Sequence, residues 1–408
     1  MFASGAIDPL SRLEALDALG DDEISAKALA SMVAATELRR VDVVAWRDLD
    51  DPEAGGSELH AHEVLSRWAA AGIDVRLWTS RVDGAAREIR RDGYRVSRRA
   101  GRYAVFPRTA FGGLSGQIGT GDAVVEIWNG MPFLTPLWSR RPRVVFLHHV
   151  HAEMWQMVLS RRLAGLGNAL EQRIAPPLYR STSIVTLSES SKSEMVDRLG
   201  FSPGQVRVAP PGIDARFSPG GAKDPEPLIV AVGRLVPVKR FDRLVDALVR
   251  IRAEHPTLRA VIVGEGYERV GLEEQVRAAG AGEWLRLPGR LDDASVVDLY
   301  RRAWLVASTS LREGWGMTLT EAAACGTPAV ATRIAGHSDA VEDGVSGLLV
   351  DSMDELALAA GRVIDDAMLR RRLSLGARRR AESFTWGATA ALAFDALADA
   401  VGRSRHRR

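Results

Sequence analysis

Residues 304–332 have the sequence WLVASTSLREGWGMTLTEAAACGTPAVAT, which contains the strongest structural signal in the chain. The apolar run WLVAST predicts a strand, SLREGWG predicts a loop, and MTLTEAAAC predicts a helix. Gly326 follows as the glycine that commonly ends a helix, and TPAVAT predicts the next strand. A strand, a helix and a second strand in this order favour a parallel α/β unit.

The same alternation extends outward in both directions. On either side of a Pro- and Gly-rich stretch, short apolar runs predict strands, and several are followed by helical spacing. These runs lie at 41–46, 73–80, 122–128, 143–149, 183–188, 228–235, 259–266, 283–290 and 346–351. The pattern predicts an α/β fold of two Rossmann-like domains facing a cleft, with parallel sheets covered on both faces.

The chain divides accordingly into six segments. We expect an acidic helical arm, an N-terminal Rossmann-like domain on the acceptor side, a linker, a C-terminal Rossmann-like donor domain, a helix that crosses back to the first domain, and a disordered basic tail. Their predicted boundaries are 1–38, 39–208, 209–227, 228–383, 384–401 and 402–408.

Composition excludes several protein classes. Of 408 residues, 26% are charged and 46% hydrophobic, which is typical of a globular protein rather than a disordered or fibrous one. The formal charge of +2 is too small to attract nucleic acid through an overall positive potential. The single cysteine, Cys325, indicates a reducing compartment. No secretory signal and no membrane-spanning run are expected, so we predict a cytoplasmic protein.

The loop and helix of the opening stretch carry candidate ligand-binding groups. Glycines at 314 and 316 let the backbone approach a ligand, and the first amides of the predicted helix, Met317 and Thr318, would face an anion. Glu313 and Glu321 supply two carboxylates, one for a sugar and one for a ribose diol. The alternative interpretation is that both glutamates are solvent-exposed acids beside a tight turn. The glycines directly before the predicted start of the helix make this alternative less favourable.

A second candidate site follows the strand at 228–235. In GRLVPVKRFD, Arg234 and Lys239 stand at the carboxyl end of this strand, where they could neutralise a diphosphate. Lysine is rare in this chain, so its presence here is suggestive. A solvated surface pair is the alternative from this segment alone.

Together with VGEG at 263–266 and DGVSGLLVD at 343–351, these motifs resemble the family 4 glycosyltransferases of the GT-B fold. The resemblance implies a retaining transferase of nucleotide diphosphate sugars, acting in glycan, glycolipid or cell-envelope polysaccharide synthesis, with no required cofactor or metal. It implies that the donor diphosphate lies against Arg234 and Lys239, the ribose against Glu321 and the sugar against Glu313. The remaining implied donor contacts are Gly233, Gly264, Gly266, Gly314, Gly316, Met317 and Thr318.

The resemblance extends to two segments of the N-terminal half. DPEAGGSELHAHEV (51–64) matches the family's glycine loop, in which Gly55 and Gly56 would lie against the donor phosphate and the acceptor. RVVFLHHVHAEMW (143–155) places histidines after a strand, one of which would contact the transferred sugar. We favour His148 for this role, with His149 as the alternative.

Other functions fit the sequence less well. The histidines at 60, 62, 148, 149 and 151 invite a metal site, but the chain has no HExxH motif and no second cysteine. The glycines of VGEGYERVG lack the spacing of a dinucleotide fingerprint, which disfavours a nicotinamide enzyme. A non-catalytic nucleotide-sugar binding protein, a nucleotide-sugar epimerase and a phosphorylase of the same fold remain alternatives.

Residues 87–108 form an arginine-rich segment with interleaved aromatic residues. It holds eight arginines against Glu88 and Asp92. The pattern indicates either a solvated β-hairpin face or a peripheral contact with anionic lipid at the inner face of the cell membrane, near a glycan or lipid-linked acceptor. A nucleic-acid surface is disfavoured.

Overall fold

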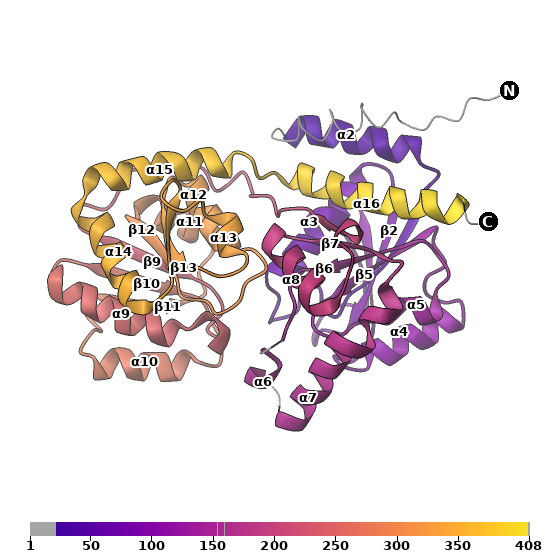
Figure 1. Ribbon diagram of the computed structural model, residues 1–408, viewed down its shortest axis with the longest axis horizontal. Helices are drawn as coiled ribbons and strands as arrows, with labels where there is room; N and C mark the ends of the chain where they lie inside the picture. Colours follow the sequence, from indigo (N-terminus) through magenta and orange to yellow (C-terminus); the bar gives the residue numbers. More distant parts are fainter. Residues whose placement is uncertain (1–21, 153, 159, 407–408) are drawn as a thin grey trace. The chain divides into compact units, whose positions relative to one another are not determined.

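The computed structural model describes residues 22–152, 154–158 and 160–406, and the chain divides into two compact units. Unit 1 comprises Met1–Gly212 and Phe384–Arg408, and unit 2 comprises Ile213–Ser383. Each unit is an α/β domain built on a sheet of mostly parallel strands (Figure 1). The prediction of two Rossmann-like domains is confirmed, while residues 1–21 of the expected N-terminal arm lie outside the described residues.

Unit 1 is built on an eight-stranded sheet in the order β3-β4-β2-β1-β5-β6-β7-β8. Every neighbouring pair is parallel except β3 and β4, which form an antiparallel hairpin. The strands are β1 (Arg40–Val44), β2 (Asp74–Ser80), β3 (Glu88–Arg91), β4 (Tyr94–Ala100), β5 (Ala123–Trp128), β6 (Arg143–Leu147), β7 (Ser183–Thr186) and β8 (Val206–Val208).

Helices cover both faces of this sheet. Along β5, Val125 and Ile127 belong to the core shared with α3 and α16, whereas Val124 and Trp128 are buried on the other side. A central strand buried on both faces is mostly apolar, with Glu126 the exception in β5, which explains the nearly continuous apolar runs in the sequence. The helices are α2 (Asp22–Ala35), α3 (Gly56–Ala70), α4 (Val105–Leu114), α5 (Thr135–Trp138), α6 (Met154–Val158), α7 (Arg161–Ala169), α8 (Glu189–Leu199) and α16 (Trp386–His406), with shorter turns at Leu170–Ile174, Pro176–Tyr179 and Pro203–Gln205.

The C-terminal helix α16 belongs to unit 1 and packs against α2 and α3 (Figure 1). Trp68 Nε1 donates to the Ala390 carbonyl over 2.9 Å, which ties α3 to α16. The disordered tail expected from residue 402 is instead helical as far as His406. Arg405 pairs with Glu37 at 2.6 Å, and Arg403 donates to Ser183. These contacts with distant segments stabilise the last turn of the helix, whose own sequence has no apolar pattern.

Unit 2 contains a fully parallel six-stranded sheet in the order β11-β10-β9-β12-β13-β14. No helix or strand lies between Val208 and Leu228, where the linker was expected. The strands are β9 (Leu228–Val232), β10 (Arg259–Val263), β11 (Leu285–Gly289), β12 (Leu305–Ser308), β13 (Ala329–Thr332) and β14 (Gly347–Val350). The helices are α9 (Phe241–Glu254), α10 (Arg269–Ala278), α11 (Asp293–Arg302), α12 (Met317–Ala324), α13 (His337–Ala340), α14 (Met353–Asp365) and α15 (Ala367–Ala381), preceded by a 3₁₀ turn at Pro237–Lys239.

The arginine-rich segment 87–108 contains the β3–β4 hairpin at the edge of the unit 1 sheet. Five of its eight arginines form ion pairs with Asp48, Asp50, Glu53, Asp74 or Glu88, namely Arg91, Arg95, Arg98, Arg99 and Arg102. Most of its positive charge is therefore neutralised within the fold. The hairpin interpretation is confirmed, and membrane contact through this segment stays a prediction.

Candidate functional site

The loop after β12 and the start of α12 form the centre of the site in unit 2. Gly316 precedes the helix with φ +110°, in the left-handed region that favours glycine. A Cβ at this position would lie 3.1 Å from Cδ2 of the buried His337. The amides of Met317 and Thr318 are the first of α12, where no preceding turn of helix offers them a carbonyl acceptor. This start of a helix suits an anion.

Lys239 and Glu313 form an ion pair beside this helix. Lys239 Nζ donates to Glu313 Oε1, and Ser310 Oγ donates to the same oxygen over 2.9 Å. Burial acts to raise the pKa of Glu313, but the charges of Lys239 and His337 outweigh it and lower the pKa to about 2. Glu313 is therefore a carboxylate at every physiological pH, and the structure brings two predicted site residues into direct contact.

Backbone contacts fix the position of Lys239. Thr309 Oγ1, at the end of β12, donates to the carbonyls of Lys239 and Arg240 over 3.0 and 2.9 Å. Arg240 itself has φ +51°, a left-handed conformation rarely adopted by a residue with a side chain. The 3₁₀ turn that carries Lys239 is thus tied to the loop that carries Glu313.

Two of the predicted glycines, Gly264 and Gly266, allow two loops to pack backbone against backbone. A Cβ on Gly264 would lie 1.8 Å from the Gly233 carbonyl oxygen, and one on Gly266 would lie 2.2 Å from the Leu235 carbonyl oxygen. Leu235 N donates to the Glu265 carbonyl over 2.8 Å. The two glycines after β10 are therefore required by close packing, whether or not they also contact a ligand, whereas a Cβ on Gly233 would come no nearer than 3.4 Å to a side chain.

Arg234 differs from Lys239 in its surroundings. Its side chain is exposed, and no acidic partner for it is found within residues 22–152, 154–158 and 160–406. It is therefore available to an anionic ligand without first breaking an ion pair. The structure does not bring Arg234 into contact with Glu313.

Glu321 lies on α12 and faces Tyr300 of α11. The Tyr300 hydroxyl donates to Glu321 Oε2 over 3.5 Å, and burial raises the pKa of Glu321 to about 7. The nearby charge of Arg216 counteracts this rise but does not overcome it. Near neutral pH the group is poised between carboxylic acid and carboxylate, and hydroxyl donors from a ligand would favour the carboxylate.

In unit 1, the glycine loop opens α3 as expected. Gly55 is the residue before the helix, and its amide donates to Glu58 Oε2 over 2.8 Å. Glu58 also accepts from Arg47 Nε at 3.3 Å, while Asn129 donates to Ser57 Oγ over 3.0 Å. The loop containing Gly55 and Gly56 is thus held at the carboxyl ends of β1 and β5.

His148 lies at the end of β6 and is buried, with 5% of its surface exposed. Its Nε2 lies 3.2 Å from Nδ1 of His60 on α3, which is fully buried. Burial lowers the pKa of His148 well below 6.5 and that of His60 to about 4, so both rings are neutral at pH 7. His149, the alternative candidate, stacks on His151 instead, with ring centroids 4.7 Å apart.

Sequence reasoning missed the supporting residues of this site. His337 Nδ1 donates to the Thr332 carbonyl over 2.8 Å, and its Nε2 lies 3.3 Å from Ser308 Oγ, directly under the glycine loop. Its position shortly after the strand TPAVAT was the available signal. Tyr300 gave none, and His60 was considered only as a member of a possible metal site, because the roles of both depend on elements far away in the chain. Within the described part of the chain, no group of three or more His, Cys, Asp or Glu is arranged to hold a metal ion.

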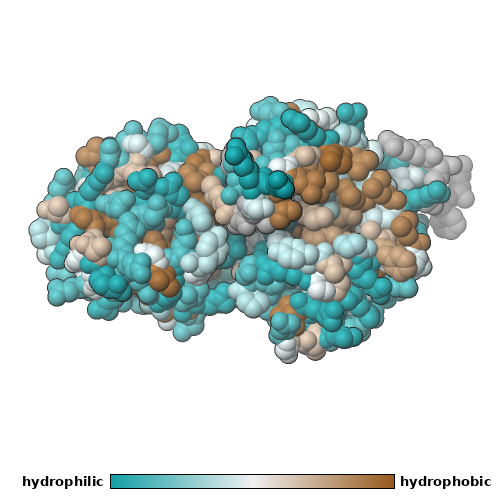
Figure 2. All heavy atoms as spheres, turned by 90° about the horizontal axis from the view of Figure 1, so that it is seen from below, coloured by the Kyte–Doolittle hydropathy of each residue, from teal (hydrophilic) through white to brown (hydrophobic). Residues whose placement is uncertain are grey.

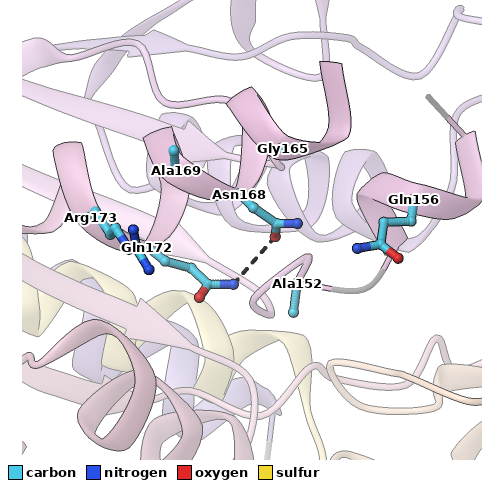
Figure 3. Close-up of a pocket in the computed structure, with 7 residues that line it drawn as sticks. All are labelled: Ala152, Gln156, Gly165, Asn168, Ala169, Gln172 and Arg173. Carbon is cyan, nitrogen blue, oxygen red and sulfur yellow. Dashed lines mark hydrogen bonds between the residues drawn. The ribbon is translucent and has the colours of Figure 1, made fainter. Parts of the chain in front are cut away.

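A polar cavity of about 380 Å³ lies in unit 1, where α7 and the turn after it approach Ala152 (Figure 3). Asn168 and Gln172 point toward each other and share a hydrogen bond of 3.3 Å, while Gln156 faces them from α6. Among the lining residues that the structure describes, Arg173 is the charged one. Three carboxamides and a guanidinium suit a ligand with hydroxyl groups and a negative charge.

Family models match both units of the chain. The model described as glycosyltransferase family 4 matches residues 54–217, and the model described as glycosyl transferases group 1 matches residues 213–380. The first model spans the glycine loop and His148, and the second spans both glutamates and the Arg/Lys segment. The chain belongs to the family 4 glycosyltransferases. The predicted resemblance is confirmed.

Curated relatives of this glycosyltransferase include several proteins named D-inositol 3-phosphate glycosyltransferase. The protein from Salinispora tropica is 35% identical over 55% of this chain and 52% of its own length. The protein from Streptosporangium roseum is 28% identical over 92% of this chain and 97% of its own length. The chain thus spans about half the length of the first relatives that it matches, and nearly all of the second protein named here.

Solved structures with the same fold include two glycosyltransferase-type proteins. Sucrose-phosphate synthase from Thermosynechococcus elongatus has a TM-score of 0.70 and 20% identity, and covers 90% of this chain and 98% of its own. HepE from Anabaena, solved in complex with UDP and glucose, has a TM-score of 0.67 and 18% identity over 91% and 100% of the two chains. The GT-B fold expected for this glycosyltransferase is confirmed. None of its described helices has the length and apolar character needed to cross a membrane.

Proposed function

We propose that the protein is a retaining glycosyltransferase that moves a sugar from a nucleotide diphosphate donor to an acceptor hydroxyl, in glycan, glycolipid or cell-envelope polysaccharide synthesis. The observation that carries this proposal is the Lys239–Glu313 pair beside the glycine-capped start of α12. This arrangement forms a site for a diphosphate with a sugar attached. The cation and the free helix amides would bind the diphosphate, and the carboxylate would accept hydrogen bonds from the sugar.

In the proposed reaction, the bond between the anomeric carbon and the diphosphate oxygen breaks, and the acceptor oxygen bonds to the same face of that carbon. The acceptor proton passes to the departing phosphate oxygen, so no protein nucleophile is required. Lys239, Arg234 and the amides of Met317 and Thr318 stabilise the negative charge that develops on the leaving diphosphate. This is the role that a divalent metal would otherwise perform, and we propose that no metal is needed.

The two glutamates have separate roles in this proposal. Glu313, held as a carboxylate by Lys239 and Ser310, accepts hydrogen bonds from the donor sugar. Glu321 accepts hydrogen bonds from the two ribose hydroxyls. These two bonds would stabilise its carboxylate, which the long 3.5 Å hydrogen bond from Tyr300 stabilises only weakly. In unit 1, neutral His148 contacts the transferred sugar, and the loop of Gly55 and Gly56 lets the acceptor and donor phosphate approach the backbone.

The cavity of unit 1 supports an acceptor that carries hydroxyl groups and an anionic group. Its carboxamides and Arg173 match such a molecule, and the curated relatives are named for an inositol phosphate acceptor. A polyol phosphate is therefore the first acceptor to test. Replacing Arg173 with Ala should raise the KM for the acceptor and leave the KM for the donor unchanged.

A thermal-shift titration tests the donor site. Wild-type protein and Glu321→Ala are titrated with UDP, GDP, ADP and their sugar conjugates, with UDP as the first candidate because HepE was solved with it. We expect one nucleotide to raise the Tm of the wild type and to do so much less in the variant. A chain that no nucleotide stabilises would contradict the proposal. Product analysis with and without acceptor then separates transfer from epimerisation of the donor.

A further inference from the structure

Helix α4 exposes an apolar stripe that its own unit does not cover. Val105, Phe106 and Thr109 point into unit 1, whereas Phe111 and Leu114 are 60% and 73% exposed. Helix α5 packs beside α4, and its Leu137 is also 60% exposed. Three large apolar side chains on two neighbouring helices are unusual on a surface that meets only water.

Helix α7 adds to this surface. Leu163 and Leu166 are 54% and 63% exposed and lie one turn apart, so they share a side of the helix. In Figure 1, α4, α5 and α7 all lie at the lower side of unit 1. Figure 2 views the molecule from that side and shows brown, hydrophobic spheres gathered over the unit 1 half. We call the exposed side of these three helices the α4–α7 face.

The described charged side chains of the α4–α7 face are all arginines. Arg108 on α4, Arg140 and Arg141 after α5, and two arginines at the start of α7 are exposed, and no ion pair involves them within residues 22–152, 154–158 and 160–406. The last two are Arg161 and Arg162.

Acidic residues are nearly absent from this part of the sequence. Between residues 93 and 170 the acids are Asp122, Glu126 and Glu153. Asp122 accepts from the amides of Arg39 and Arg40, and Glu126 is fully buried. Glu153 lies outside the described residues. The arginines of the face therefore keep their charge, in contrast to the neutralised β3–β4 hairpin.

We propose that the α4–α7 face docks on an anionic phospholipid bilayer. Phe111, Leu114 and Leu137 would enter the boundary between headgroups and acyl chains, while the arginines would contact lipid phosphates. A surface whose described charges are all basic, with several apolar side chains, complements an anionic bilayer, since a protein partner would have to supply matching acids and pockets. The inference stands apart from the proposed donor site, because no residue of that site lies on this face.

Vesicle flotation tests this proposal with the full chain. Vesicles of phosphatidylcholine alone are compared with vesicles of equal parts phosphatidylcholine and phosphatidylglycerol, at low and high salt. We expect binding to the anionic vesicles only, and we expect salt to weaken it. The double variant Phe111→Ser/Leu114→Ser should lower the bound fraction about tenfold, and Arg140→Ser/Arg141→Ser should weaken binding chiefly at low salt.

A matched control is available in unit 2. Leu358 and Met368 are 66% and 74% exposed, so Leu358→Ser/Met368→Ser removes similar apolar surface elsewhere and should leave vesicle binding unchanged. The Tm of each variant confirms that it is folded. Equal binding to both vesicle types, no binding, or equal loss in the control would overturn the proposal. Self-association that Phe111→Ser/Leu114→Ser abolishes, without vesicle binding, would overturn it in favour of a second copy of the chain.

Discussion

Nε2 of His148 lies 3.2 Å from Nδ1 of His60, and the two residues are 88 positions apart in the sequence. His60 comes from α3 and His148 from the end of β6, so the contact joins the glycine-loop helix to the neighbouring strand end. Burial keeps both rings neutral, and a neutral imidazole donates at one nitrogen and accepts at the other. The contact therefore couples the tautomers of the two rings, because one of the two facing nitrogens must carry the proton and the other must accept it.

Replacing His60 should affect turnover through the orientation of His148. We expect His60→Leu to lower kcat/KM about tenfold, because it leaves His148 Nε2 without a partner. His60→Asn keeps a polar atom near the position of Nδ1 and should recover most of this loss. Steady-state kinetics of both variants check the prediction. Equal losses in the two would indicate a packing role only.

Replacing Lys239 should damage catalysis more than any other single change in unit 2. Lys239→Ala removes charge from the proposed diphosphate site and leaves Glu313 without its cation, so kcat/KM should fall about 10²-fold. Arg243→Ala is the matched control, since Arg243 is an exposed cation on α9 whose partners are Asp242 and Asp246. Near-normal activity of Lys239→Ala would refute the role of this residue.

Glu321 should make nucleotide binding depend on pH. Its carboxylate must accept from the ribose, and its pKa of about 7 means that acidification protonates it. Donor affinity should therefore weaken as the pH falls from 8 to 6, and binding at pH 7 should release protons. Calorimetry in buffers of different ionisation enthalpy measures this release. In Glu321→Gln the release should disappear, and its persistence would assign the proton to another group.

The same group links stability to pH. The pKa of Glu321 rises from 4.5 to about 7 on folding, so the folded protein binds more protons in this range than the unfolded chain. The stability that this proton uptake contributes is fully present below pH 4.5, the pKa in the unfolded chain. It is lost as the pH rises through about 7, the pKa in the folded protein. Glu321→Gln should raise the free energy of unfolding at pH 8 by about 3 kcal/mol and leave it little changed at pH 4. Denaturant titrations at both pH values check this.

Gly264 and Gly271 should respond oppositely to alanine. At Gly264, the new Cβ would lie 1.8 Å from a backbone oxygen at φ +147°, so the protein should lose about 2–4 kcal/mol of stability. Gly271 lies inside α10 with nothing within 4 Å, and Gly271→Ala should add about 0.5–1 kcal/mol. Chemical denaturation of the two variants gives both values. A neutral Gly264→Ala would mean that the two loops can separate.

Chelation tests the proposal that the leaving diphosphate needs no metal. We expect EDTA to leave transferase activity unchanged, because Lys239, Arg234 and the α12 amides carry the positive charge of the site. Loss of activity that only an added divalent ion restores would contradict this assignment.

Much of the fold and part of the site were predictable, because they depend on neighbours in the chain. Most parallel strands of both units followed from apolar runs, although β8 was not predicted, and the loop of Gly314 and Gly316 followed from the order of strand, glycines and helix. The helical end of α16 was missed, since Arg403 and Arg405 are ordered by contacts with Ser183 and Glu37 rather than by a local pattern.

The sequence by itself determined the two α/β domains and made Glu313 and Lys239 candidates, because periodicity and glycine spacing are local properties, while His148 became a candidate through the family resemblance. Only the tertiary structure decided which of them meet. Lys239 and Glu313 are 74 residues apart, and strand order, which no local pattern encodes, brings them together. The tertiary structure also decided the protonation states. His148 and Glu313 are both buried, but only Glu313 has a cation beside it, so His148 is neutral and Glu313 is ionised. The free energy of a charge depends on all the groups folded around it.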